Sequence, residues 1–134
     1  MWVAPGGSHL IVVSEGHQTR LRVTQEPPEN SCRPSVDVLF RSVAKVFRNR
    51  ALALVLTGMG QDGLRGCEAL AGTEAEIVVQ DEATSVVWGM PGFVARNGLA
   101  DAVLPLSKIG EYLVKRESVR RPLSRRLMSR TVTP

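Results

Sequence analysis

The clearest hydrophobic segment of the chain is a run of six apolar residues, 51–56, that ends at Thr57. A continuous apolar run of this length predicts a strand that is buried on both faces of a parallel sheet. A loop with three glycines and one carboxylate, Asp62, follows directly. Because ligands and catalytic groups of open α/β sheets gather at the carboxyl ends of the strands, Asp62 is the first candidate for chemistry.

The polarity pattern on both sides of this run predicts further elements. Apolar residues recur at helical spacing from 36 to 47, and Ser35 with Asp37 provides an N-terminal cap and a favourable first-turn charge. The other predicted elements are strands at 2–4, 76–80 and 102–106, a hairpin of 9–13 and 19–24, and helices at 62–71, near 93–96 and at 107–114. Together they predict an α/β fold, a doubly wound, mostly parallel sheet with a small antiparallel hairpin.

Length and composition indicate one compact domain. The chain has 134 residues, of which 43% are hydrophobic, and no segment approaches the ~18 apolar residues of a membrane span. The first residues lack the basic and apolar regions of a signal peptide, so we expect a cytoplasmic protein without membrane insertion. Cys32 and Cys67 lack the spacing of metal ligands, so neither a metal site nor a disulfide is expected, and Cys67 is predicted to be core.

The positive charge of the chain is concentrated at its C-terminal end. Residues 115–134 carry a net charge of +6, which leaves −2 for residues 1–114. We therefore expect a domain at 1–114 with no basic face for nucleic acid. The segment 115–134 has few apolar residues, which favours a disordered tail over a partner-binding helix around 123–128.

The glycine-rich loop has two interpretations from its spacing alone. Gly58, Gly60 and Gly63 match G-x-G-x-x-G between a strand and a helix, and Asp81 with Glu82 stands about where a ribose-binding acid is expected, which favours a dinucleotide-binding domain. The alternative is that the glycines only shape a tight turn and Asp62 caps the helix at 62–71. The spacing leaves both interpretations open.

Four blocks of sequence, in this order, change that balance. They are Ala4-Pro5-Gly6-Gly7-x-His9, the stretch 32–43 (CRPSVDVLFRSV), the stretch 56–63 (LTGMGQDG) and the stretch 80–91 (QDEATSVVWGMP). In this combination the chain resembles the chemotaxis protein-glutamate methylesterase family over residues 2 to about 114. The resemblance implies a catalytic domain that hydrolyses glutamate methyl esters on methyl-accepting chemoreceptors and deamidates receptor glutamines, with no cofactor.

The resemblance also implies roles for particular residues. Family members use a serine nucleophile, a histidine base and an aspartate that orients the histidine, and the aspartate corresponds to Asp62. A carboxylate on a rigid loop suits that role, since it fixes the imidazole tautomer and stabilises the imidazolium. The residues expected to line or flank the site are Thr57, Gly58, Met59, Gly60, Cys32 and Arg33. Cys32 stands where other members can carry a histidine and has no assigned catalytic part.

The chain departs from the family pattern at two of the three catalytic positions. The family's serine and histidine precede the block at 4–9, and the only histidines here are His9, predicted to be a structural or rim residue, and His17, predicted to be a turn residue. No serine lies in a G-x-S-x-G elbow. We therefore expect the C-terminal part of a methylesterase catalytic domain, without its receiver domain. It is inactive alone, or is completed by the missing N-terminal half or by self-association; a dinucleotide-binding domain stays the alternative.

Overall fold

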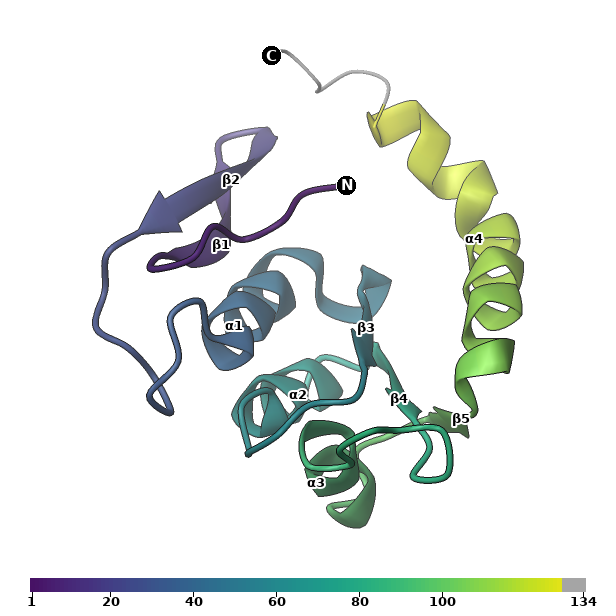
Figure 1. The fold of residues 1–134 in the computed structure, drawn as a ribbon. Helices are drawn as coiled ribbons and strands as arrows, with labels where there is room; N and C mark the ends of the chain where they lie inside the picture. Colours follow the sequence, from purple (N-terminus) through teal and green to yellow (C-terminus); the bar gives the residue numbers. More distant parts are fainter. Residues whose placement is uncertain (129–134) are drawn as a thin grey trace.

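The structure of the chain, a computed structural model, describes residues 1–128, with the surroundings of individual side chains through residue 119. Five strands and four α-helices are joined by short loops and one 3-10 turn, η1 (Figure 1). The strands are β1 His9–Glu15, β2 Gln18–Thr24, β3 Leu52–Val55, β4 Glu76–Gln80 and β5 Ala102–Leu104. The helices are α1 Val36–Phe47, α2 Leu64–Ala71, α3 Met90–Arg96 and α4 Leu106–Met128, and η1 spans Arg48–Arg50.

A three-stranded parallel sheet in the order β3-β4-β5 lies between two helical layers (Figure 1). Helices α1, α2 and α3 lie on one side of the sheet and α4 lies on the other. Helices on both faces of a parallel sheet are the doubly wound arrangement that the sequence predicted. The expected α/β class with a small antiparallel hairpin is therefore confirmed.

The core lies between the sheet and the layer of α1, α2 and α3. It consists of alternate residues of β3 and β4 packed against apolar side chains of the helices, among them Val55, Ile77, Val79, Cys67, Leu70 and Val94. Cys67 is fully buried, as the sequence predicted. The prediction that β3 is buried on both faces is wrong for the face toward α4, where Leu52 and Leu54 are only half-buried. The central strand β4, not β3, is covered on both sides.

The hairpin of β1 and β2 forms a separate antiparallel sheet beside α1. Strand β1 packs on the helix with alternate residues buried, and the backbone N–H of Val12 donates to Ser42 Oγ at 2.9 Å. Strand β2 is exposed along nearly all of its length. The hairpin is confirmed, whereas residues 2–4 form no strand, so that prediction is wrong.

Helix α4 is longer than predicted. It continues through Met128, so the disorder expected from residue 115 does not describe residues 115–128; residues 129–134 lie outside the described part. Ile109 is buried against the sheet, and Tyr112 Oη–H and Arg116 both bond the Glu76 carboxylate at the start of β4. The domain boundary at residue 114 stays a prediction. Within residues 1–128, no helix has the length and apolar character needed to cross a membrane.

Candidate functional site

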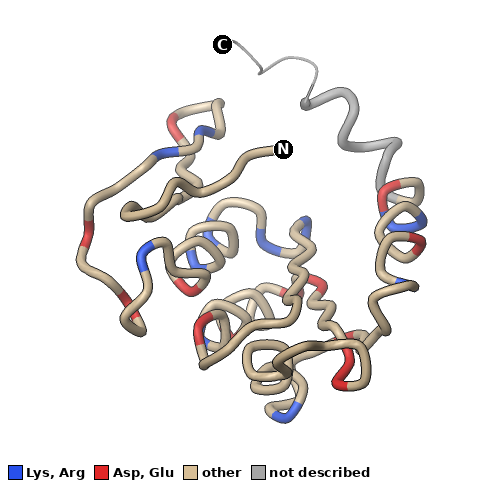
Figure 2. Tube along the Cα trace, viewed as in Figure 1, with Lys and Arg blue, Asp and Glu red and all other residues tan. Residues whose placement is uncertain are grey.

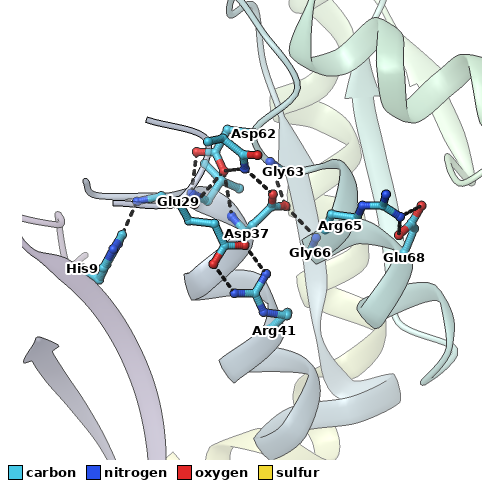
Figure 3. Close-up of polar contacts among 12 residues, drawn as sticks. His9, Glu29, Asp37, Arg41, Asp62, Gly63, Arg65, Gly66 and Glu68 are labelled. Carbon is cyan, nitrogen blue, oxygen red and sulfur yellow. Dashed lines mark hydrogen bonds and ion pairs between the residues drawn. The ribbon is translucent and has the colours of Figure 1, made fainter. Parts of the chain in front are cut away.

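Asp62 lies in the loop between β3 and α2, and its carboxylate is bonded to the N-terminus of α1 (Figure 3). Oδ2 accepts the backbone N–H of Val36 at 2.7 Å, and Oδ1 accepts the N–H of Asp37 at 3.1 Å and the hydroxyl of Ser35 at 2.7 Å. The residue is 6% exposed. The interpretation that Asp62 caps its own helix is therefore wrong, because it caps α1. The hydroxyl of Ser35 does not cap α1 as predicted but donates to Asp62.

Asp37 makes the corresponding contact with α2. Its Oδ1 accepts the N–H groups of Gly63 at 3.0 Å and Gly66 at 2.7 Å, and the residue is fully buried. Sequence reasoning treated Asp37 only as a first-turn charge of its own helix and missed this role. Gly66 was the available signal, since a glycine within a helix often marks a close backbone approach. A Cβ at Gly66 would lie 2.6 Å from Phe40 Cβ.

Asn30 joins the two carboxylates. Its Nδ2 donates to Asp37 Oδ2 at 2.7 Å and lies 3.4 Å from Asp62 Oδ1. Asn30 and the following Ser31 both have left-handed backbone conformations, with φ of 53° and 60°. Asparagine adopts this conformation more readily than most residues, which suits it to this turn. The sequence analysis did not single out Asn30.

A histidine, a serine and an aspartate are connected here, but they do not form a catalytic triad. His9 Nε2–H donates to the Pro27 carbonyl at 2.9 Å, and its Nδ1 accepts the backbone N–H of Ser35 at 3.1 Å. In a triad the imidazole accepts the serine hydroxyl proton, whereas the Ser35 hydroxyl donates directly to Asp62. His9 and Ser35 are also buried from solvent. His9 thus joins the β1 strand to the loop before α1, which agrees with its predicted structural role.

The glycine loop after β3 is held by the segment before α3. The Thr57 hydroxyl donates to the Val87 carbonyl at 3.0 Å and accepts the Val87 N–H at 2.9 Å. The carbonyl of Gly58 accepts the N–H groups of Gly89 at 3.1 Å and Met90 at 2.8 Å. These bonds fix the base of the loop. Its tip carries the side chain of Met59, which is 85% exposed.

Cys32 and Arg33 lie in the turn between Asn30 and Ser35. Asn30 and Ser35 both contact Asp62. The structure therefore brings this turn and the glycine loop together around Asp62. The side chains of Cys32 and Arg33 are half-buried and form hydrogen bonds within their own loop. The Cys32 thiol donates to the Asn30 carbonyl, and the Arg33 guanidinium donates to the Glu26 carbonyl. Their role in lining a site stays a prediction.

The dinucleotide interpretation needs free backbone N–H groups at the start of α2 to bind a pyrophosphate. Two of these groups, on Gly63 and Gly66, already bond the Asp37 carboxylate. A carboxylate of the chain itself thus occupies the position of the phosphate, and this interpretation has no anion site to rest on. Among residues 1–128, no cluster of three or more His, Cys, Asp or Glu side chains is placed to hold a metal ion.

Comparisons with known proteins agree on one family. The chain is 57% identical over 115 residues to the protein-glutamate methylesterase/protein-glutamine glutaminase of Trichodesmium erythraeum and 50% identical over 115 residues to one from Rhodospirillum rubrum. These matches cover 86% of the chain but 33% and 30% of the relatives, so the chain spans about a third of their length.

The fold matches as well. The structure superposes on the crystal structure of the Thermotoga maritima CheB methylesterase catalytic domain with a TM-score of 0.83 and 33% sequence identity. This match covers 85% of the chain and 60% of the solved domain. The family model described as CheB methylesterase matches residues 1–113. The loop carrying Asp62 and the turn at 30–35 both lie within that match, and the chain belongs to the CheB methylesterase family.

Proposed function

We propose that residues 1–113 supply the aspartate-bearing part of a protein-glutamate methylesterase active site. The reaction would hydrolyse methyl esters of glutamate side chains on chemoreceptors and deamidate receptor glutamines. Family membership and the names of the relatives support the reaction class. Because the chain spans about a third of those relatives, the serine and histidine would come from a segment outside these 134 residues.

The observation that carries this proposal is the hydrogen bonding of the Asp62 carboxylate. Three donors from the start of α1 fix its position, and Oδ2 accepts only one of them, from Val36. Each carboxylate oxygen has about two lone-pair sites. Oδ1 accepts bonds from Ser35, Asp37 and, at 3.4 Å, Asn30. Oδ2, in contrast, accepts only the Val36 N–H and keeps one site open. Oδ2 is therefore the atom we assign to accept an imidazole N–H. A carboxylate held in this way would fix the tautomer of a histidine and stabilise it when it takes the serine proton.

The surroundings of Asp62 suit a protein substrate. Leu56, Met59, Val86 and Val87 are all exposed apolar residues on the glycine loop and on the segment bonded to it. We propose that Thr57, Gly58, Met59 and Gly60 form one wall of the cleft and that Cys32 and Arg33 flank it. The methylated receptor segment would lie along this wall. A cytoplasmic location belongs to the same proposal.

A chimaeric enzyme tests the role of Asp62. Residues 1–115 of the chain replace the matching segment of the Trichodesmium erythraeum relative, and release of methanol from methylated receptor is measured. We expect the chimaera to be active and Asp62→Asn to lower kcat by about four orders of magnitude, as loss of a triad carboxylate does. Asp37→Asn is the matched control, since it disturbs the neighbouring helix cap but contacts no imidazole in the proposal.

The variants separate a catalytic role from a structural one. If Asp37→Asn loses as much activity as Asp62→Asn while both remain folded, Asp62 acts only as a helix cap and the proposal is wrong. The isolated chain should show no turnover above a blank, because it lacks the nucleophile and base of the family. Static light scattering of the chain, alone and mixed with the upstream segment of the relative, tests whether it self-associates or is completed by that segment.

A further inference from the structure

The second half of α1 and the turn after it carry an unbalanced positive charge. From residue 38 to residue 61 the chain contains four basic residues, Arg41, Lys45, Arg48 and Arg50, and no carboxylate. Figure 2 shows basic positions along α1 and η1. The net charge of −2 on residues 1–114 predicted no basic face for nucleic acid, and that stays a prediction; positive charge nevertheless gathers on this part of α1 because the acidic residues lie elsewhere in the sequence.

Two grooves flank these side chains. One, of about 410 Å³, lies between α1 and α2 and is lined by Arg41, Ala44, Lys45, Arg48, Ala69 and Thr73. The other, of about 300 Å³, lies between α1 and β1 and is lined by Arg41, Lys45 and Ser42 with the apolar residues Ile11, Val12, Val13 and Val38. Arg41 and Lys45 line both grooves. The surface therefore combines positive charge on α1 with apolar lining residues in the groove on each side of the helix.

The molecule already places one carboxylate on this surface. Both oxygens of Glu29, in the irregular segment before α1, accept hydrogen bonds from the Arg41 guanidinium. This pairing lowers the pKa of Glu29, chiefly through the hydrogen bonds from Arg41. Lys45 and Arg48 have no such partner, since within residues 1–119 no carboxylate lies at salt-bridge distance from either side chain.

The surface fits an acidic protein segment better than a membrane or a nucleic acid. None of the exposed large apolar side chains belongs to α1 or η1, so no residue there could insert into a lipid layer. The aromatic ring of Phe47 lies under the Arg50 guanidinium, 5.8 Å from its carbon, and is not free to stack on a base. We propose that the basic surface, defined as Arg41, Lys45, Arg48 and the two grooves, binds an acidic amphipathic segment of a partner protein.

This inference goes beyond the proposed esterase site and does not depend on it. The Asp62 carboxylate lies at the N-terminus of α1, whereas Lys45 and Arg48 lie at the opposite end of the helix. A partner bound here would leave the loop at 57–60 uncovered. The surface would therefore hold a protein in place while another part of that protein reaches the loop at 57–60.

Fluorescence anisotropy of the 134-residue chain with a labelled peptide tests the proposal. The probe carries glutamate and leucine on opposite faces of one helix; one matched peptide replaces each glutamate by glutamine, and another replaces each leucine by alanine. Removing either kind of contact should weaken binding about tenfold or more, and salt should weaken binding of the glutamate peptide. Lys45→Gln with Arg48→Gln should have the same effect as the glutamine peptide. Lys108→Gln with Lys115→Gln, on α4, is the control of equal charge change and should bind within about twofold of the unmodified chain.

Three results would overturn the proposal. The first is an absence of saturable binding by the glutamate peptide. The second is an equal loss of binding in the α4 control, which would mean that only overall charge matters. The third is displacement of the peptide by phosphatidylglycerol vesicles or by a single-stranded oligonucleotide, together with weaker binding of that competitor by the variant altered at Lys45 and Arg48. That result would assign the surface to another class of partner. All four altered side chains are exposed, so the variants should keep the circular dichroism spectrum of the chain.

Discussion

Asp37 and Asp62 each accept backbone N–H groups at the start of the helix to which the other is joined. Asp62, in the loop before α2, accepts N–H groups at the start of α1, and Asp37, in the first turn of α1, accepts N–H groups at the start of α2 (Figure 3). A negative charge near a helix N-terminus also interacts favourably with the helix dipole. The loop that presents Asp62 is thereby fixed to two helices rather than to one.

This reciprocal capping predicts that loss of either carboxylate lowers the free energy of unfolding strongly and that the two losses are coupled. Asp37→Ala or Asp62→Ala should each lower the free energy of unfolding by about 3 kcal/mol, because each leaves buried N–H groups without their charged acceptor. The double substitution should cost less than the sum, since either one alone already loosens the contact. Urea unfolding measures all three. Glu82→Ala, at an exposed loop position, should stay within about 0.5 kcal/mol, and additive effects would show that the two caps are independent.

Gly66 allows α1 and α2 to approach closely enough for this reciprocal capping. A Cβ there would lie 2.6 Å from Phe40 Cβ and 3.2 Å from the backbone Cα of Asp37. Gly66→Ala should therefore destabilise the chain by about 2 kcal/mol through overpacking. Gly110→Ala is the matched control, because nothing lies within 4 Å of its Cβ and alanine favours a helix by about 1 kcal/mol over glycine. Thermal melts compare the two; equal melting temperatures would contradict the close approach.

Local pattern was enough to predict most of the fold. The helical spacing of apolar residues predicted α1, and the polarity pattern with its turn residues predicted β4 and the hairpin, because each is specified by neighbours in the chain. The length of α4 was not predicted, since the Arg- and Ser-rich composition after residue 114 indicated disorder. Its early turns are held by contacts of Tyr112 and Arg116 with Glu76, which is distant in sequence.

The contacts of the candidate site could not be predicted from local sequence either. The glycine loop and the family pattern selected Asp62, but its partners are 25 to 27 residues away. Neither the spacing of residues nor helix propensity specifies which helix a buried carboxylate will cap. The roles of Asp37 and Asn30 were missed for this reason. The catalytic role of Asp62 stays a prediction, which the chimaeric enzyme tests.

The two cysteines should differ sharply in reactivity. Cys67 is fully buried, and burial raises the pKa of its thiol to about 12, whereas Cys32 is half-buried in the turn beside Asp62. The thiolate is the reactive form, so an aromatic disulfide reagent at neutral pH should modify Cys32 in the folded chain and Cys67 only after unfolding. Cys32→Ser should abolish the fast reaction. Rapid modification of both thiols in the folded chain would show that the core opens readily around α2.

Acid should weaken the contact between Glu29 and Arg41. The hydrogen bonds from Arg41 lower the pKa of Glu29 below its usual 4.5, so the folded state binds this proton less readily than the unfolded state. The contribution is therefore complete above the unfolded pKa of 4.5 and is lost as pH falls below it through the folded value. Both side chains are more than a third exposed, so solvent screening limits the effect to about 1 kcal/mol or less.

Urea unfolding at a series of pH values measures this loss. Glu29→Gln should lower stability at neutral pH and flatten the curve below pH 4.5, because the titrating group is gone. Glu82→Gln is the matched control, since within the described part of the chain its carboxylate bonds no other side chain, and it should leave the acid limb of the curve in place. If Glu29→Gln keeps the full acid dependence of the unmodified chain, the loop at 25–34 is not held to α1 by this pair. Glu29 would then be free to leave the basic surface when a partner segment binds there.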